Sequence, residues 1–202
     1  MDPIEIQTPH GPARAHLHEP DGEVKGLLVL GHGAGGGVAA PDLVRAELEA
    51  RNLGFATALV EQPYRVAGRK APPPAAKADE AWTAAVASLR ERLGEPSCLI
   101  TGGRSFGARV ACRTAAQTGA SAVLCLAFPE HPPGKPEKSR QGELDAVRVP
   151  VLVVQGKSDP FGMPRGGPGK EIVVVAGNHG LKSDLDALGS AVADWLGKKL
   201  AA

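Results

Sequence analysis

The sequence has few aromatic residues and no excess of charge of either sign. Phenylalanine, tryptophan and tyrosine make up 3% of the 202 residues, too few for a surface that stacks nucleic-acid bases. The formal net charge is +1 and long basic runs are missing, which argues against nucleic acid or an anionic membrane as a partner. We therefore expect a small-molecule partner, and the composition leaves the oligomeric state open.

Long apolar runs are also missing, and we expect no signal peptide. No stretch approaches the roughly 20 apolar residues of a membrane span, and residues 1–5 lack the basic and apolar regions of a signal peptide. Cys98, Cys112 and Cys125 fall in segments with the pattern of buried strands and helices, so we expect reduced thiols in the core. They lack metal-ligand spacing. We expect no metal, no cofactor and a cytoplasmic location.

Apolar segments alternate with helical patterns along most of the chain. The strand-like segments are residues 27–30, 55–60, 98–101, 122–127, 151–154 and 172–175, and each has the continuous apolar pattern of a parallel strand covered on both faces. The helical patterns are residues 41–53, 82–93 and 181–195. This alternation predicts one α/β domain over residues 1–202, with a mostly parallel central sheet and helices on both faces.

The remaining segments are predicted to lie at the borders of this sheet. Residues 4–8 and 13–17 alternate between apolar and polar, which predicts an edge hairpin with its turn at Gly11 and Pro12. Residues 62–74 and 129–143 are rich in proline, glycine and basic residues, and we expect both to be loops. Ligands bind at the carboxyl ends of parallel strands, and these two loops should overhang that edge.

Two of the 26 glycines flank a serine in the sequence Gly103-Arg104-Ser105-Phe106-Gly107. An apolar strand precedes this G-x-S-x-G pattern and a stretch with helical character follows it, which is the setting of a nucleophile elbow. The alternative is an ordinary glycine-rich turn in which Ser105 caps the helix. A nucleophilic serine needs a histidine base and an acid, so the presence of these partners decides between the two interpretations.

A serine nucleophile needs a histidine base, and two histidines follow Ser105 in the sequence. His179 comes after residues 172–175 and just before the last helix, whereas His131 lies in the proline-rich loop. In α/β-hydrolases the order along the chain is serine, acid, histidine, and this order favours His179.

Asp159 is the best candidate for the acid that orients this base. It follows the apolar run 151–154, so it should lie on the same sheet edge as Ser105 and His179. The rivals Asp184 and Asp186 open the C-terminal helix, where stabilisation of the helix dipole explains them.

Backbone donors for an oxyanion are expected in two places. One is the N–H of Phe106, directly after the nucleophile. The other is the sequence GHGAGGG at residues 31–37, where Ala34 is the first candidate and Gly33 and Gly35 follow. A phosphate-binding loop would need a following Gly-Lys-Ser/Thr, and a dinucleotide site would need an acidic residue further on; the sequence has neither.

Several polar residues close to these motifs receive supporting roles. We expect His32 to hold the glycine-rich loop through its side chain, and Arg104 to pair with a carboxylate near Ser105. Tyr64, Arg69 and His131 lie in the two predicted loops and are candidates for the rim of a substrate pocket.

These residues and several longer blocks carry a resemblance to a known family. The blocks are residues 31–36, 64–73, 102–109, 128–135, 155–162 and 178–182. The chain resembles the small, lid-less α/β-hydrolases related to dienelactone hydrolase. It is most similar to the bacterial group that shares the hydrolase-like domain of the NSL-complex regulatory subunit and its testis-expressed relative. The resemblance implies an α/β-hydrolase fold without a large lid domain and a triad of Ser105, Asp159 and His179.

The resulting hypothesis is a serine hydrolase of the carboxylesterase or thioesterase type that cleaves a small acyl ester or thioester through an acyl-enzyme. Dienelactone hydrolases use a cysteine nucleophile, and Ser105 departs from that pattern. Two alternatives stay open. One is an acyl-transfer or carbon–carbon hydrolase with the same triad, and the other is a non-catalytic binding or scaffold protein, as some eukaryotic relatives serve as complex subunits.

Overall fold

Strands and helices alternate along the chain, as the apolar pattern predicts. The computed structural model describes residues 3–200. The strands are β1 (Ile4–Thr8), β2 (Gly11–His18), β3 (Gly26–Gly31), β4 (Phe55–Glu61), β5 (Leu99–Arg104), β6 (Ala122–Leu126), β7 (Val151–Gly156) and β8 (Lys170–Val175). The helices are α1 (Pro41–Asn52), α2 (Pro63–Val66), α3 (Ala75–Arg92), α4 (Phe106–Thr118), α5 (Gln141–Asp145) and α6 (Leu185–Leu200).

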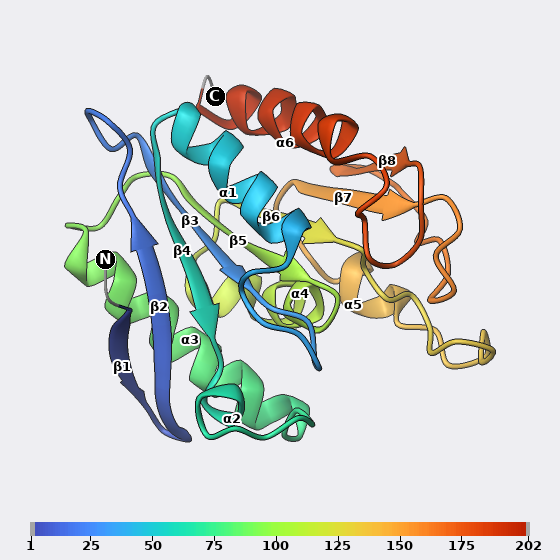
Figure 1. Ribbon diagram of the computed structural model, residues 1–202, viewed down its shortest axis with the longest axis horizontal. Coiled ribbons are helices and arrows are strands. Elements are labelled where there is room, and N and C mark those ends of the chain that lie inside the picture. Colours follow the sequence, from blue (N-terminus) through green and yellow to red (C-terminus); the bar gives the residue numbers. More distant parts are fainter. Residues whose placement is uncertain (1–2, 201–202) are drawn as a thin grey trace.

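Within residues 3–200, eight strands form one sheet with the order β1-β2-β4-β3-β5-β6-β7-β8 (Figure 1). From β4 to β8 neighbouring strands are parallel, whereas β2 pairs antiparallel with both β1 and β4. The predicted hairpin is present, but its turn is not at Gly11 and Pro12. Thr8 pairs with Gly11, so the chain reverses at Pro9 and His10, and the φ of +102° at Gly11 allows this early return.

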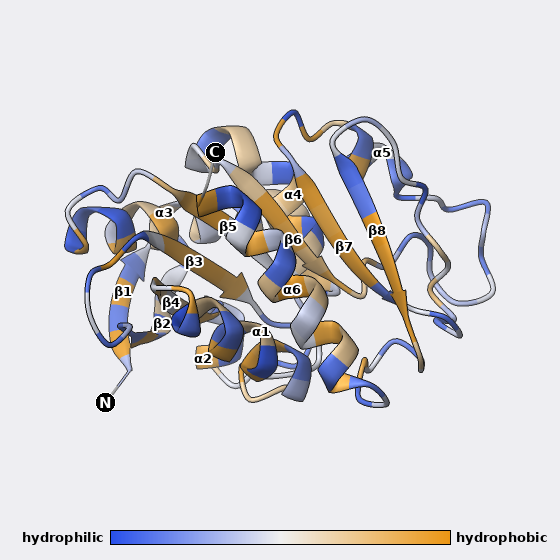
Figure 2. Cartoon of the chain, turned by 90° about the horizontal axis from the view of Figure 1, so that it is seen from above, coloured by the Kyte–Doolittle hydropathy of each residue, from blue (hydrophilic) through white to orange (hydrophobic). Residues whose placement is uncertain are grey.

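Helices cover both faces of the sheet, which confirms the predicted fold class. Helices α1 and α6 pack against each other on one face, and α3 and α4 lie on the other (Figure 1). Successive residues of β3 serve the two faces: Leu28 and Leu30 belong to the cluster under α1 and α6, whereas Leu27 and Val29 belong to the cluster under α3. Strands β3, β6 and β7 are accordingly hydrophobic over most of their length (Figure 2).

Burial differs from the prediction at two places. We expected residues 172–175 to be covered on both faces, but β8 ends the sheet and Val174 is 51% exposed. A run of apolar residues fits an edge strand as well as a central one, so the pattern alone could not place it. Cys98 is only half-buried because it precedes β5, while Cys112 and Cys125 are buried free thiols with their Sγ atoms 3.5 Å apart.

Helix ends and loops also differ in detail from the prediction. Helix α6 begins at Leu185 rather than at residue 181, because the carboxylate of Asp184 accepts the backbone N–H of Ala187 and ends the preceding loop. The predicted loops 62–74 and 129–143 contain α2 and the first residues of α5. None of the helices within residues 3–200 has both the length and the apolar character that a membrane crossing requires.

Substitution of Gly102 in β5 tests how closely β5 and β6 pack in the sheet. A Cβ there would lie 2.2 Å from the carbonyl oxygen of Leu124 in β6, so we expect Gly102→Ala to lower the free energy of unfolding by about 2–3 kcal/mol. Gly197 in α6 has no described atom within 4 Å of a built Cβ, and Gly197→Ala should raise the free energy of unfolding by about 0.5–1 kcal/mol. Urea unfolding measures both. A Gly102→Ala protein as stable as wild type would contradict the packing.

Candidate active site

Ser105 occupies a one-residue turn between β5 and α4. Its backbone angles are φ +54° and ψ −106°, outside the regions that residues with a side chain favour. Gly103 and Gly107 make this turn possible, because a Cβ on either would lie 2.4 Å from the carbonyl oxygen of Gly31. Close approach of β5 and α4 to β3 therefore accounts for the strained backbone of Ser105, whose side chain is half-buried.

The structure brings Ser105, His179 and Asp159 together at the carboxyl edge of the sheet. Ser105 follows β5, Asp159 follows β7 and His179 follows β8. The Nε2 of His179 lies 2.9 Å from the Oγ of Ser105, and its Nδ1 lies 2.8 Å from the Oδ2 of Asp159. With the ring proton on Nδ1, the histidine donates to the carboxylate and Nε2 is free to accept the hydroxyl proton.

Two residues that the sequence did not single out hold this acid and base. The amide Nε2 of Gln155, a buried residue of β7, donates to Oδ2 of Asp159 at 2.9 Å. The backbone N–H of Phe161 donates to Oδ1 at 2.8 Å, and its ring stacks on His179 with centroids 4.0 Å apart. The only available signal was a glutamine inside an apolar strand. The Phe161 contact has no sequence signature.

Arg104 pairs with a carboxylate near Ser105, as predicted. Its Nε lies 2.9 Å from Oδ2 of Asp42, a fully buried residue of α1, and its Nη2 donates to the carbonyl oxygen of His179 at 2.9 Å. Burial raises the pKa of Asp42 above its usual value, and the positive charge of Arg104 opposes this rise. Arg104 also packs on Gly33, whose built Cβ would lie 2.9 Å from Nη1. One guanidinium thus links α1, the His179 loop and the glycine-rich loop.

His32 holds the glycine-rich loop, also as predicted. Its Nδ1 donates to the carbonyl oxygen of Gly33 at 2.8 Å, and its Nε2 accepts the backbone N–H of Gln62 at 3.1 Å. Burial lowers the pKa of His32, so the ring is neutral and can fill both roles. The hydroxyl of Tyr64 donates to the carbonyl oxygen of Ala34 at 2.8 Å, and burial raises the pKa of Tyr64 to about 12. The loop is therefore fixed from two sides.

Of the two residues predicted as oxyanion donors, Phe106 directly follows Ser105, whereas the glycine-rich loop comes nearest to Ser105 at Gly33, the residue before Ala34. Phe106 is the first residue of α4, so its backbone N–H has no acceptor within the helix. Ala34 follows Gly33, and a Cβ on Gly33 would lie 3.7 Å from the Cβ of Ser105. The glycine-rich loop thus passes directly beside the serine.

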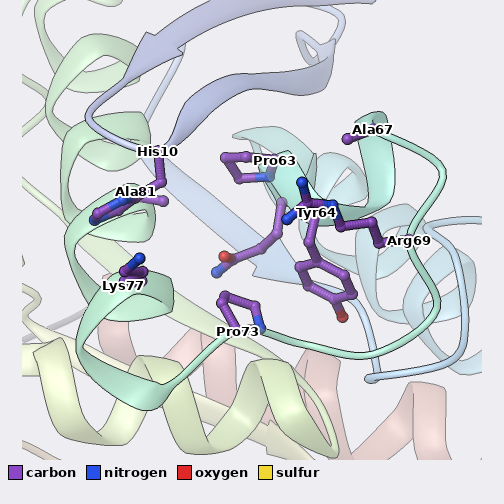
Figure 3. Close-up of a pocket in the computed structure, with 9 residues that line it drawn as sticks. His10, Pro63, Tyr64, Ala67, Arg69, Pro73, Lys77 and Ala81 are labelled. Carbon is purple, nitrogen blue, oxygen red and sulfur yellow. The ribbon is translucent and has the colours of Figure 1, made fainter.

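The three residues predicted to line a substrate pocket do not line the same cavity. Tyr64 and Arg69 line a cavity of ≈ 190 Å³ beside α2 and α3 (Figure 3). His131 instead donates its backbone N–H to the carbonyl oxygen of Phe161 at 2.9 Å and lies beside the loop of Asp159. A groove of ≈ 410 Å³ is lined by the sequence neighbours of the serine and the histidine, Arg104 and Gly180, but not by Ser105 or His179 themselves. Its lining residues include Arg104, Gly36, Gly180 and Lys182. Among residues 3–200, no group of three His, Cys, Asp or Glu side chains could hold a metal.

Comparison with known proteins agrees with this fold. Residues 24–171 match the family described as the alpha/beta hydrolase domain, so the chain belongs to that family. A serine hydrolase without a lid from Xanthomonas campestris is 19% identical, with a TM-score of 0.82, over 100% of this chain and 95% of its own.

Two further solved structures are similar in fold. Est1E from Butyrivibrio proteoclasticus is 17% identical, with a TM-score of 0.80 and full coverage of both chains. A dienelactone hydrolase from Anabaena variabilis is 16% identical, with a TM-score of 0.70 over 99% of this chain and 96% of its own. No curated protein matches the chain by sequence.

Arg104→Met tests the link between Asp42 and the His179 loop. The substitution leaves a buried carboxylate without its positive partner, and we expect a loss of roughly 3 kcal/mol in the free energy of unfolding. The double variant Asp42→Asn/Arg104→Met should lose less, since no charge is then stranded. Urea unfolding and ester kinetics measure the effects. Unchanged melting temperature, kcat and KM in Arg104→Met would refute the link.

His32 should make the folded protein sensitive to mild acid. Because burial lowers its pKa, the unfolded chain takes up a proton at a higher pH, near 6.5, than the folded chain does. The stability this residue contributes is therefore present above pH 6.5 and lost as pH falls towards the folded pKa, at up to about 1.4 kcal/mol per pH unit. The slope of unfolding free energy against pH should be shallower in His32→Asn. Equal slopes in the two proteins would contradict a neutral, buried His32.

Proposed function

We propose that the protein is a serine hydrolase that cleaves a small acyl ester or thioester, of the carboxylesterase or thioesterase type. The proposal rests on one observation, the hydrogen-bonded series from Ser105 through His179 to Asp159, with distances of 2.9 and 2.8 Å. In this proposal Ser105 is the nucleophile, His179 the general base and Asp159 the acid that orients the ring.

The proposed reaction assigns a role to each of these groups. His179 accepts the hydroxyl proton as Ser105 attacks the acyl carbon, and Asp159 stabilises the imidazolium that forms. Backbone N–H groups of Phe106 and Ala34 are proposed to donate to the oxyanion, assisted by the N-terminal dipole of α4. His179 then protonates the leaving alcohol or thiol. Water, deprotonated by His179, hydrolyses the acyl-enzyme in the second half of the reaction.

The surroundings of the site support a small substrate. The groove beside Arg104 and Gly180 has a volume of ≈ 410 Å³, and its walls combine small residues of segment 36–41 with the charged side chains of Asp42, Arg104 and Lys182. Est1E, which has the same fold, has been solved with ferulic acid bound. We include a ferulate ester among the trial substrates for that reason.

Other predictions rest on the sequence alone. These are one domain over residues 1–202, a cytoplasmic location, and a small-molecule partner rather than nucleic acid or membrane. Membership of the group that shares the NSL-complex and testis-expressed hydrolase-like domain is likewise our proposal. It is supported by the blocks at residues 64–73 and 128–135.

Ser105→Ala tests the proposed nucleophile directly. A fluorophosphonate probe should label wild type and fail to label Ser105→Ala, because only an activated serine hydroxyl reacts with it. With p-nitrophenyl acetate, loss of Ser105 should lower kcat by a factor of about 10⁵–10⁶, and Asp159→Asn should cost somewhat less. Ser121→Ala removes an exposed serine directly before β6 and serves as the control.

Two outcomes would contradict the proposal. Labelling that persists in Ser105→Ala would place the reactive group elsewhere. If wild type shows neither labelling nor turnover across a panel of acetyl, butyryl and feruloyl esters and acetyl thioesters, the chain is a non-catalytic binding protein with this fold.

A further inference from the structure

A second cavity lies apart from the groove beside Arg104. It is bounded by the turn of the β1–β2 hairpin, by α2 and by the first turns of α3 (Figure 3). Its volume is ≈ 190 Å³, or about six times the volume of a water molecule in the liquid. The space therefore suits a molecule of a few carbon atoms rather than a long chain.

The walls of this cavity carry positive charge. Arg69 and Lys77 lie on opposite sides of it (Figure 3), and neither forms an ion pair within residues 3–200. His10 also lines the cavity, and its Nε2 is 2.6 Å from a carboxylate oxygen of Glu80. Helix α3 begins after Pro74, which has no polar side chain for a cap, so its N-terminal dipole adds positive potential at this side. The cavity favours an anion.

Gln62 adds a hydrogen-bond acceptor to the same wall. The residue is 4% exposed, and its Nε2 donates to the carbonyl oxygen of Ala78 at 3.3 Å. Its Oε1 is buried and has no hydrogen-bond partner among the described residues. A buried carbonyl oxygen without a donor is unfavourable, and a ligand hydroxyl in the cavity would supply one.

We propose that this cavity binds a small organic oxyanion that also carries a hydroxyl group. Arg69 and Lys77 would contact the anionic group, and Gln62 would accept the hydroxyl proton. The ring of Tyr64 provides the apolar wall for the carbon chain. A polyol phosphate and a hydroxycarboxylate share this chemistry. The site does not depend on Ser105 or on the proposed hydrolase activity.

Calorimetric titration of the full chain with matched ligands tests this proposal and distinguishes a polyol phosphate from a hydroxycarboxylate as the ligand. Glycerol phosphate is compared with propyl phosphate, and glycerate with propionate, so that each pair differs in hydroxyl groups only. We expect the hydroxylated member of at least one pair to bind about three- to tenfold more tightly. The pair that binds more tightly shows whether the anionic group is a phosphate or a carboxylate. Binding should weaken as salt is added.

Three variants then assign the contacts. Arg69→Gln/Lys77→Gln should weaken binding of both members of the preferred pair about tenfold. Gln62→Met should remove the preference for the hydroxylated member and leave binding of the other unchanged. Lys70→Gln alters an exposed lysine of the same loop that does not line the cavity, and it should bind like wild type.

Thermal melting of each variant confirms that it is folded, and a second substitution, Gln62→Leu, replaces Gln62→Met if the latter is not. Absence of binding at millimolar ligand would mean that water alone fills the cavity, and would overturn the proposal. Binding that survives in Arg69→Gln/Lys77→Gln, or an unaltered hydroxyl preference in folded Gln62 variants, would also overturn it.

Discussion

Contact among three glycines sets the geometry on which the whole site depends. Side chains on Gly103 or Gly107 would strike the backbone of Gly31, so only hydrogen at these positions lets β5 and α4 approach β3 so closely. The approach leaves a single residue for the turn, and Ser105 adopts an unfavourable backbone conformation to fill it. Packing in the centre of the sheet thereby directs the hydroxyl towards His179.

Paired charges then fix loops that the sheet alone would leave free. The carboxylates of Asp42 and Asp159 are both 0% exposed, and each faces a partner from another segment. Asp159 holds the ring of His179, while Arg104 joins Asp42 to the backbone carbonyl of the same histidine. Buried charges are tolerable when opposite charges or donors surround them. His179 is therefore held at two points, by its ring and by its main chain.

Sequence reasoning located Ser105, Asp159 and His179 because each follows an apolar run, and parallel strands end at a common edge. It did not find Gln155 or Phe161, since their contacts depend on how separate loops fold against each other. The exposure of β8 was wrong for a related reason. Strand order decides which strand lies at the border, and a local apolar pattern does not encode that order.

The border position of β8 also bears on the local stability of the site. Among residues 3–200 this strand has β7 as its single sheet neighbour, Val174 is 51% exposed, and the loop bearing His179 follows it directly. Border strands open at a lower free energy than strands held on both sides. Fraying of β8 would carry His179 away from Ser105 while the remaining sheet stayed intact. The distance between His179 and Ser105 would then depend on local opening of one edge strand rather than on unfolding of the whole sheet.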